Sequence, residues 1–162
     1  MKDYILCAID FSESSLHTLQ CANKIAIGTG AQLTVLYSYR LIQTGKVADV
    51  LSFKRKTEEE CKNKFLQLME NVTDGKKERV SFVIEIGFYS DNIVNFIRKN
   101  PSSIVVVSDS LAQSIYDHKG LTLLQFLKGL KVPLLIVPDF AQATASEAQL
   151  REHHVVLGKI AL

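Results

Sequence analysis

The chain has 162 residues, a length typical of one domain, and with 47% hydrophobic residues it can bury a full core. Its net charge of +2 and the absence of a long apolar run give no sign of a nucleic-acid or membrane partner. No basic start leads into an apolar run, and Cys7, Cys21 and Cys61 lack metal-ligand spacing, so we expect a cytoplasmic protein with reduced thiols and no metal.

Short apolar runs rich in β-branched residues alternate with stretches of helical periodicity. The apolar runs predict buried strands at residues 4–9, 33–37, 80–86, 104–107 and 134–137. Apolar residues at helical spacing predict helices around residues 16–26, 61–72, 93–97 and 123–130. This alternation indicates a parallel sheet with right-handed crossovers, so we predict a single three-layer α/β domain of about five strands and four helices.

Two segments stand apart from the alternation. Residues 40–56 read as a long polar connection after the second strand, which we take as solvated, with a lid or a partner surface near the strand tips as the alternative. Residues 139–162 begin with small and polar residues, and we expect them to lie outside the main sheet, with a short helix ending near Gly158 as one arrangement. We therefore divide the chain into a domain at residues 1–138 and a C-terminal tail at residues 139–162.

An acidic residue directly follows the first predicted strand. Asp10 comes after the buried run at residues 4–9 and before Ser12, where a polar turn leads into the first helix. The carboxyl end of a parallel strand faces the crevice where α/β folds bind ligands. Asp10 is therefore a candidate ligand-binding residue, unless its carboxylate accepts hydrogen bonds from its own turn instead.

Several blocks of the chain resemble the universal stress protein family. YILCAIDFSESSLHTLQCANKIA is similar to the opening strand, acid, Phe-Ser and helix of that family, and GAQLTVLYSY to its next passage from helix to strand. SSIVVVSDS and KVPLLIVP resemble its fourth and fifth strands, and Gly87 matches a glycine that precedes its third helix. The resemblance covers residues 2–138 and leaves out the tail.

The resemblance implies a Rossmann-like fold of the adenine nucleotide alpha hydrolase-like type, with strand order 3-2-1-4-5. It also implies a homodimer formed by antiparallel pairing of the last strands, which here comprise Leu134, Leu135, Ile136 and Val137. In ATP-binding members, adenine is held by the acid at the tip of the first strand and by the backbone at the end of the second. These two positions fall on Asp10 and Ser38.

ATP-binding members also carry a loop of the form G-x2-G-x9-G-[ST] after the fourth strand. Its glycines let backbone N–H groups approach phosphate oxygens and adopt positive φ. The positions that match this loop are Ser108 or Val107 for the first glycine, Ser110 or Leu111 for the second, Gly120 for the third, and Leu121, with Thr122 one place late, for the hydroxyl residue. Only the third glycine is retained, so the phosphate loop departs from the family pattern.

The changed loop predicts a weaker nucleotide site. Asp109 adds a negative charge beside the expected phosphate, and losing two charge-assisted hydrogen bonds would weaken binding by roughly 10²–10⁴-fold. The hydroxyls of Ser108, Ser110 and Ser114 and the Lys119 side chain offer partial compensation. The candidate nucleotide-binding residues are Asp10, Ser38, Ser108, Ser110, Gly120 and Thr122.

We therefore predict a dimeric, non-enzymatic stress-response protein with weak or lost nucleotide binding, no bound cofactor and an unidentified protein partner. The alternative is an ATP-binding member whose phosphate loop is rebuilt around serines and which hydrolyses ATP slowly at most. No residue has the setting of a general base for water, so we assign no catalytic residue. A phosphate-accepting receiver domain is excluded because Gly87, not an aspartate, follows the third strand.

Overall fold

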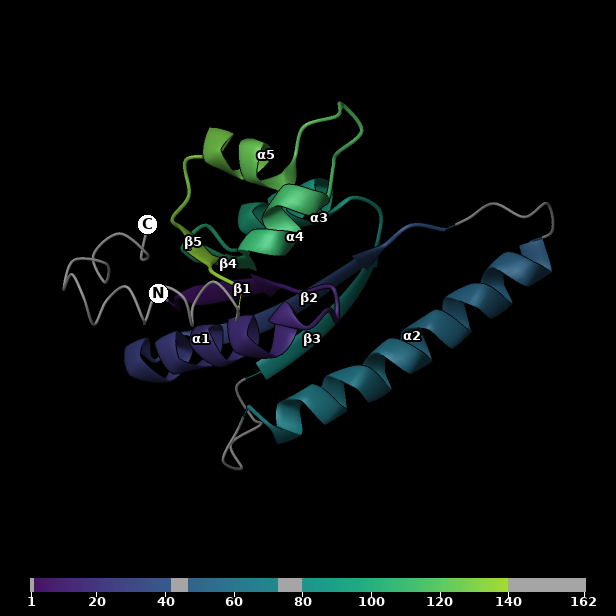
Figure 1. Ribbon diagram of the computed structural model, residues 1–162, viewed down its shortest axis with the longest axis horizontal. Helices are drawn as coiled ribbons and strands as arrows, with labels where there is room; N and C mark the ends of the chain where they lie inside the picture. Colours follow the sequence, from purple (N-terminus) through teal and green to yellow (C-terminus); the bar gives the residue numbers. More distant parts are fainter. Residues whose placement is uncertain (1, 42–46, 73–79, 140–162) are drawn as a thin grey trace.

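Strands and helices alternate along the described part of the chain, residues 2–41, 47–72 and 80–139 of a computed structural model (Figure 1). In chain order the elements are β1 (Tyr4–Ala8), α1 (Ser14–Thr29), β2 (Gln32–Tyr39), α2 (Val47–Glu70), β3 (Val80–Ile86), α3 (Tyr89–Lys99), β4 (Ser103–Ser108), α4 (Asp109–Ser114), α5 (Leu123–Gly129) and β5 (Leu134–Val137). All the predicted strands form, with boundaries that shift by a few residues.

The strands form one parallel sheet in the order β3-β2-β1-β4-β5, which is the predicted fold class. β1 lies in the centre, where Ile5 is the register partner of Leu33 in β2 and of Ile104 in β4. The order reverses between β1 and β4, so the carboxyl ends of these two strands flank the point where open α/β sheets bind ligands. β3 and β5 are the two edges.

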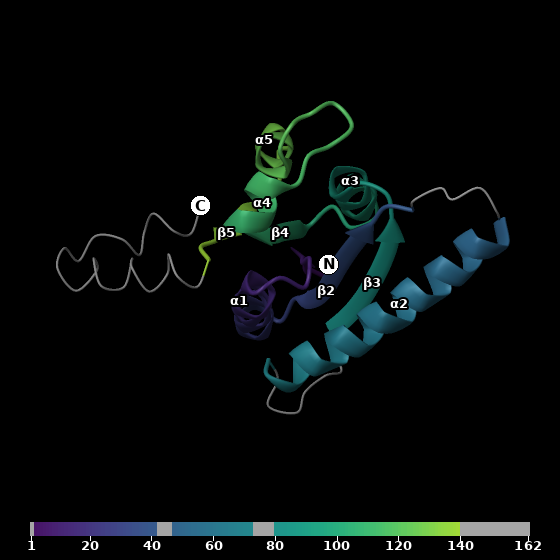
Figure 2. The same cartoon turned by 45° about the vertical axis from the view of Figure 1, so that its right-hand side comes forward.

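Helices cover both faces of the sheet, with α1 and α2 on one face and α3, α4 and α5 on the other (Figure 2). Side chains alternate along β1, so Ile5 and Cys7 pack with Leu19 of α1, whereas Leu6 packs on the opposite side with Ile93 of α3. Burial raises the pKa of the Cys7 thiol, which keeps it protonated at neutral pH. None of the three cysteines forms a disulfide.

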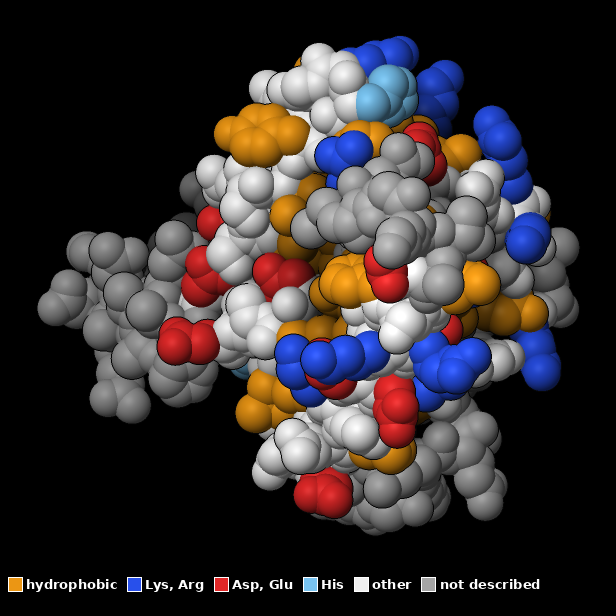
Figure 3. Space-filling view, turned by 90° about the vertical axis from the view of Figure 1, so that its right-hand side faces the viewer, with side chains coloured by type: hydrophobic (Ala, Val, Ile, Leu, Met, Phe, Trp, Pro, Cys, Tyr) orange, Lys and Arg blue, Asp and Glu red, His pale blue; other side chains and the backbone are white. Residues whose placement is uncertain are grey.

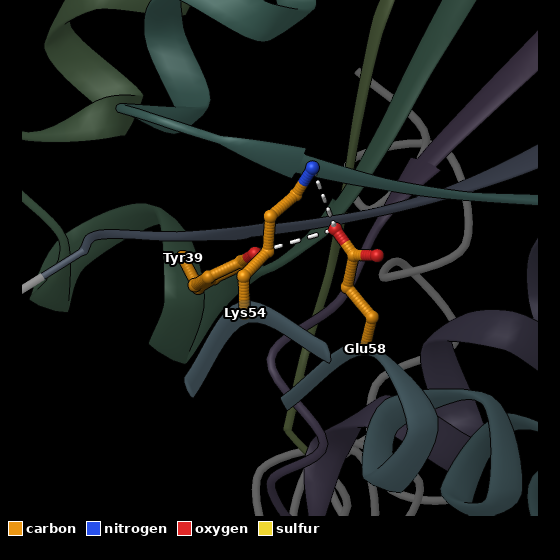
Figure 4. Close-up of polar contacts among 3 residues, drawn as sticks. All are labelled: Tyr39, Lys54 and Glu58. Atoms are coloured by element: carbon orange, nitrogen blue, oxygen red, sulfur yellow. Dashed lines mark hydrogen bonds and ion pairs between the residues drawn. The ribbon is translucent and has the colours of Figure 1, made fainter. Parts of the chain in front are cut away.

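The predicted polar connection at residues 40–56 is wrong in its second part, because α2 begins at Val47 and is 24 residues long. Residues 54–60, in its third and fourth turns, are rich in Lys, Arg and Glu, which favour a helix without burial. Lys54 Nζ lies 3.9 Å from Glu58 Oε1, and the same oxygen accepts a hydrogen bond of 3.3 Å from the Tyr39 hydroxyl (Figure 4). Burial, reinforced by the negative charge of Glu58, raises the pKa of Tyr39 to about 12.

A further helix, α4, occupies part of the segment that the sequence predicts as a phosphate loop. It starts directly after β4, where Ser108 Oγ accepts a hydrogen bond from the Leu111 amide. Leu111 and Ala112 are buried, so one turn of helix is enough to place them in the core. The count of four predicted helices is therefore one short in the described residues.

No helix within residues 2–41, 47–72 or 80–139 is long and apolar enough to cross a membrane. The predicted tail at residues 139–162 lies outside the described residues, apart from Asp139. The division of the chain into a domain and a tail stays a prediction.

Candidate functional site

Asp10 lies just after β1, where the chain turns into α1. Its Oδ1 accepts hydrogen bonds from the Ser12 amide at 3.0 Å and from Ser15 Oγ at 3.2 Å. This Asx turn stabilises Phe11, which lies between Asp10 and Ser12 and whose φ of 60° is uncommon for a residue with a side chain. The Phe11 ring packs 5.0 Å from the Tyr37 ring, between centroids. One carboxylate oxygen of Asp10 thus accepts hydrogen bonds from its own turn, which is the alternative role that the sequence analysis gave this residue.

Ser38, near the end of β2, is buried beside the tip of β1. Its Oγ accepts a hydrogen bond of 2.9 Å from Asn92 Nδ2 of α3. The Tyr89 hydroxyl donates a 2.6 Å bond to the Ile9 carbonyl, and burial raises the pKa of this phenol. Polar groups at the carboxyl ends of β1 and β2 are therefore already hydrogen-bonded to α3. The sequence carries no signal for the roles of Tyr89 and Asn92.

Serine hydroxyls connect the turn after β1 with the start of α4. Ser14 Oγ lies 3.1 Å from Ser110 Oγ, and Ser110 Oγ lies 3.3 Å from Ser108 Oγ. Ser12 Oγ is 3.0 Å from Ser14 Oγ and extends the same chain of hydroxyls. The structure thus brings together Ser108 and Ser110 of the candidate set and adds Ser14, which the sequence analysis missed.

The first amides of α4 donate to the protein itself. The Ser110 amide donates to Asp139 Oδ1, just past β5, at 3.3 Å. The Leu111 amide donates to Ser108 Oγ at 3.1 Å. Each amide has one hydrogen, so the Ser110 or Leu111 amide must give up its present acceptor before it can donate to a phosphate oxygen.

Gly120 and Thr122 belong to a hairpin at residues 115–123 that connects α4 to α5. Asp117, which is buried, accepts hydrogen bonds at Oδ1 from the Lys119 amide at 2.8 Å and from the Leu121 amide at 3.0 Å. The Gly120 amide donates to the Asp117 carbonyl at 3.1 Å, with a φ of 80° at the glycine. Gly120 therefore serves the hairpin turn.

Thr122 caps α5. Its Oγ1 accepts a hydrogen bond from the Gln125 amide at 3.2 Å, and the Gln125 side chain accepts one from the Thr122 amide at 3.0 Å. This reciprocal pair is a capping box. The hydroxyl and the amide that the family pattern would offer to a nucleotide are both used by the helix end.

The tip of the hairpin reaches the segment that follows β3. The His118 ring lies 5.8 Å from the Phe88 ring, between centroids, and Arg40 Cζ lies 4.4 Å from the centroid of the same ring. Phe88 follows β3 and Arg40 follows β2, so these contacts fix the hairpin against the carboxyl ends of both strands. A cation–π contact of this kind contributes about 0.5–1 kcal/mol at an exposed position.

A groove of about 630 Å³ lies on the α3 face of the sheet, over β2 and β3. Glu85 and Val83 contribute to its floor, and Asn95 and Arg98 of α3 to its wall. None of the candidate nucleotide-binding residues lines this groove. It is therefore a second concave surface, separate from the crevice between β1 and β4.

Comparison with known proteins shows what this architecture is similar to. The structure of UspA from Lactobacillus plantarum shares 16% identity at a TM-score of 0.66, over 83% of this chain and 96% of that chain. A universal stress protein in complex with cAMP shares 19% identity at a TM-score of 0.61, over 83% and 96%. The hypothetical protein MJ0577 shares 19% identity at a TM-score of 0.63, over 85% and 96%. At these identities the likeness shows the fold alone.

The sequence of the chain also matches a family model. No curated protein sequence gives a match. The model of the universal stress protein family, in contrast, matches residues 1–138, which include every strand of the sheet and every residue of the candidate set. Since the match covers most of the 162 residues, the chain belongs to the universal stress protein family.

Proposed function

We propose that this chain is a dimeric, non-enzymatic universal stress protein in which nucleotide binding is weak or lost and which acts by binding another protein. The observation that supports this most directly is the internal hydrogen bonding of residues 108–122. The Ser110 and Leu111 amides donate to Asp139 and Ser108, and the Lys119 amide donates to Asp117. These donors are already occupied when a nucleotide arrives.

The free-energy cost of breaking these internal hydrogen bonds argues against tight nucleotide binding. A charge-assisted hydrogen bond contributes about 1.5–3 kcal/mol. If two internal bonds must be broken to form two bonds to a phosphate, the binding free energy gains little from those two contacts. The affinity is then lower by roughly 10²–10⁴-fold, because about 1.4 kcal/mol corresponds to a factor of ten. A phosphate at the Ser110 amide would also meet the carboxylate of Asp139, which accepts from that amide.

The bonds that the two best-placed acids of the described residues make support a non-enzymatic role. Asp10, the acid at the tip of β1, accepts two hydrogen bonds from its own turn at Oδ1. Asp117 is buried and holds the hairpin. Both carboxylates thus have structural bonds, whereas a nucleotide hydrolase requires a group that takes a proton from, or orients, the attacking water.

A serine-based phosphate site is the competing proposal, and the hydroxyl chain from Ser12 through Ser14 and Ser110 to Ser108 favours it. Hydroxyls rotate and can donate to an anion without moving the backbone. One similar structure is a complex with cAMP, so a nucleotide with a single phosphate is a second ligand to test.

Dimerisation through β5 is supported by the position of that strand. β5 pairs with β4 on one side and forms an edge of the described sheet on the other. Leu134 and Ile136 are half-buried in the single chain. Pairing of β5 with the same strand of a second copy would satisfy the free backbone groups and cover these side chains.

The test is native mass spectrometry of the purified protein, followed by thermal unfolding with ATP and Mg²⁺ or with cAMP. We expect a dimer with no retained nucleotide and no shift in the unfolding midpoint at submillimolar ligand, since only a ligand well above its Kd stabilises the fold. A shift that Asp10→Ala abolishes and Asp91→Ala, an exposed acid of α3, leaves intact would overturn the proposal. Measurable ATP hydrolysis that Asp10→Ala removes would overturn the non-enzymatic role.

A further inference from the structure

The groove on the α3 side of the sheet lies apart from the nucleotide crevice. Ile93 of α3 and Leu36 of β2 belong to one buried cluster, and no described helix lies over β3 on this side (Figure 2). Leu36 and its register partner Val83 therefore form an apolar floor beside α3. The volume of about 630 Å³ is within the range of about 300–1,000 Å³ that is typical of ligand pockets.

One side of α3 forms the wall of this groove, which we call the α3 groove. The residues of the wall are spaced by three and four positions, so they share one side of the helix. They are Asn92, Asn95, Phe96 and Lys99. The Phe96 ring is half-buried and packs edge-on against the Tyr4 ring, with 6.3 Å between centroids. The wall is thus aromatic near the sheet and carries amide and charged groups nearer the solvent.

Charges of opposite sign lie at the two ends of the α3 groove. Glu85 is the register partner of Ser38, and Ser38 Oγ accepts a hydrogen bond from Asn92, so Glu85 is level with the start of α3. Lys99 follows Asn92 by seven residues, a rise of about 10 Å along the helix, and Arg98 is next to it. All three charged side chains are exposed, and within the described residues none of them forms an ion pair.

The side-chain amides between these charges have hydrogen-bonding capacity that the described residues do not use. Asn92 Nδ2 donates to Ser38 Oγ at 2.9 Å, and no described group donates to its Oδ1. Asn95 is exposed, and neither end of its amide has a partner among the described residues. A side-chain amide offers a donor and an acceptor, as a peptide group does. Two such amides in a row therefore suit the backbone of an extended chain.

The charge selectivity of the α3 groove is local. On the side of the molecule toward which α2 projects, Lys and Arg, Asp and Glu, and hydrophobic side chains lie close together (Figure 3). The net charge of the whole chain is only +2. A small net charge gives little long-range attraction for a partner of either sign. Selection therefore depends on where the charges stand along the bound segment.

We propose that the α3 groove binds an extended segment of a partner protein. The segment has a basic residue, which meets Glu85, and an acidic residue, which meets Lys99 and Arg98. An apolar side chain between them lies on Val83. In an extended chain alternate side chains face the same side, and five residues span about 13 Å from first to last. Opposite charges four residues apart, with an apolar residue midway, therefore fit the length of the groove.

This proposal rests on the part of the proposed function in which the chain binds another protein. The opposite charges, the apolar floor and the amides together match a peptide segment. A small amphoteric molecule would satisfy the charges and leave the two asparagines unused. None of these features belongs to the crevice between β1 and β4, so the outcome is independent of nucleotide affinity.

Peptide titration followed by NMR measures the contact. The probes are the acetylated and amidated peptides Lys-Thr-Val-Thr-Glu and Glu-Thr-Val-Thr-Lys, which offer the charges in both chain directions. We expect at least one of them to bind and to shift the side-chain amide signals of Asn92 and Asn95. Peptides with Lys at both ends or Glu at both ends are expected to bind about fivefold or more weakly, because one end meets a like charge. Equal affinities of all four peptides, or unmoved amide signals, overturn the proposal.

A titration with 6-aminohexanoate separates a peptide from a small amphoteric ligand. This molecule has an ammonium and a carboxylate group but no peptide group. We expect it to bind about fivefold or more weakly than the better mixed-charge peptide, because it cannot pair with the asparagine amides. An affinity equal to that of the peptide would overturn the assignment of a protein segment.

Reversing one charge of the groove gives a matched test on the protein. Glu85→Lys is expected to weaken the mixed-charge peptide by about fivefold or more and to strengthen binding of the peptide with Glu at both ends. The control is Glu59→Lys, which changes an exposed acid of α2 outside the groove and is expected to leave every affinity unchanged. Circular dichroism verifies that both variants are folded. Unchanged affinities in Glu85→Lys overturn the proposal.

The two sets of experiments fail separately. A thermal shift with ATP would overturn weak nucleotide binding and leave the peptide affinities as they are. Loss of the peptide contact would remove the α3 groove as a partner site and leave the nucleotide result unchanged.

Discussion

Three aspartates accept hydrogen bonds from backbone amides in the part of the chain that the structure describes, and they differ in how far the sequence predicts their positions. Asp10 follows a buried strand directly, so its place at the crevice follows from the apolar run before it. Asp117 stands in a polar stretch that has neither a helical nor a strand period, and Asp139 follows the last apolar run after Pro138. Asp139 accepts from Ser110, which is far from it in sequence, so only the pairing of β4 with β5 brings them together.

Replacing Asp117 by Ala removes the acceptor of two amides in the hairpin, and we expect a loss of about 2–3 kcal/mol in the free energy of unfolding, because two hydrogen bonds to a charged acceptor are lost. Urea unfolding measures this loss. Asp117→Asn keeps an oxygen at the same place and is expected to lose less than half as much. Equal losses for the two substitutions would show that the charge, rather than the acceptor geometry, matters.

The elements of this fold differ in how strongly the sequence marks them. The strands are marked by apolar β-branched runs, and all of them are found. Helix α4 has only 6 residues, too few to show a helical period. The first half of α2 resembles a solvated loop because none of its described side chains up to Glu60 is buried. The sheet order came from the family resemblance, since periodicity alone does not decide which strands are neighbours.

Two glycines at the end of α1 are expected to change stability in opposite directions when each is replaced by alanine. Gly28 lies inside the helix, and Gly30 ends it with a φ of 71°; a Cβ added at either position meets no heavy atom within 4 Å. Gly28→Ala is expected to stabilise the protein by up to about 1 kcal/mol, because alanine has the higher helix propensity. Gly30→Ala is expected to destabilise it by about 1 kcal/mol, because φ is positive there. Thermal unfolding of both variants is the measurement, and shifts of the same sign would contradict the assigned helix end.

At the scale of the whole molecule, the two edges of the sheet are used differently. β5 is short and has no further strand beside it within the described residues, whereas β3 lies beside the long helix α2. The sequence predicts the strands themselves, but an edge is a property of the assembled sheet. The proposed dimer through β5 therefore rests on the topology as much as on the residues that form that strand.

The backbone direction of β5 provides a test of the dimer. The Pro133 carbonyl accepts a hydrogen bond of 3.0 Å from the Val105 amide, so by alternation along the strand the Ile136 N–H points away from β4. Ile136→Pro removes that donor without removing a bond to β4, and we expect a monomer by sedimentation. Ile136→Ala loses a comparable side chain but keeps the N–H and is expected to remain a dimer. A dimeric Ile136→Pro protein would exclude pairing through this strand.

The hydrogen bond from the Ser110 amide to Asp139 joins the crevice to the β5 edge of the sheet, where we propose the dimer forms. Asp139 lies two residues after the end of β5, so a displacement of that strand would also move the acceptor on which the start of α4 depends. Separation of the subunits would then loosen an anion-facing amide, and an anion that captured this amide would in turn weaken the subunit contact. Such coupling is reciprocal by thermodynamic necessity, so monomer and dimer are expected to differ in nucleotide affinity by the same factor by which nucleotide shifts their equilibrium.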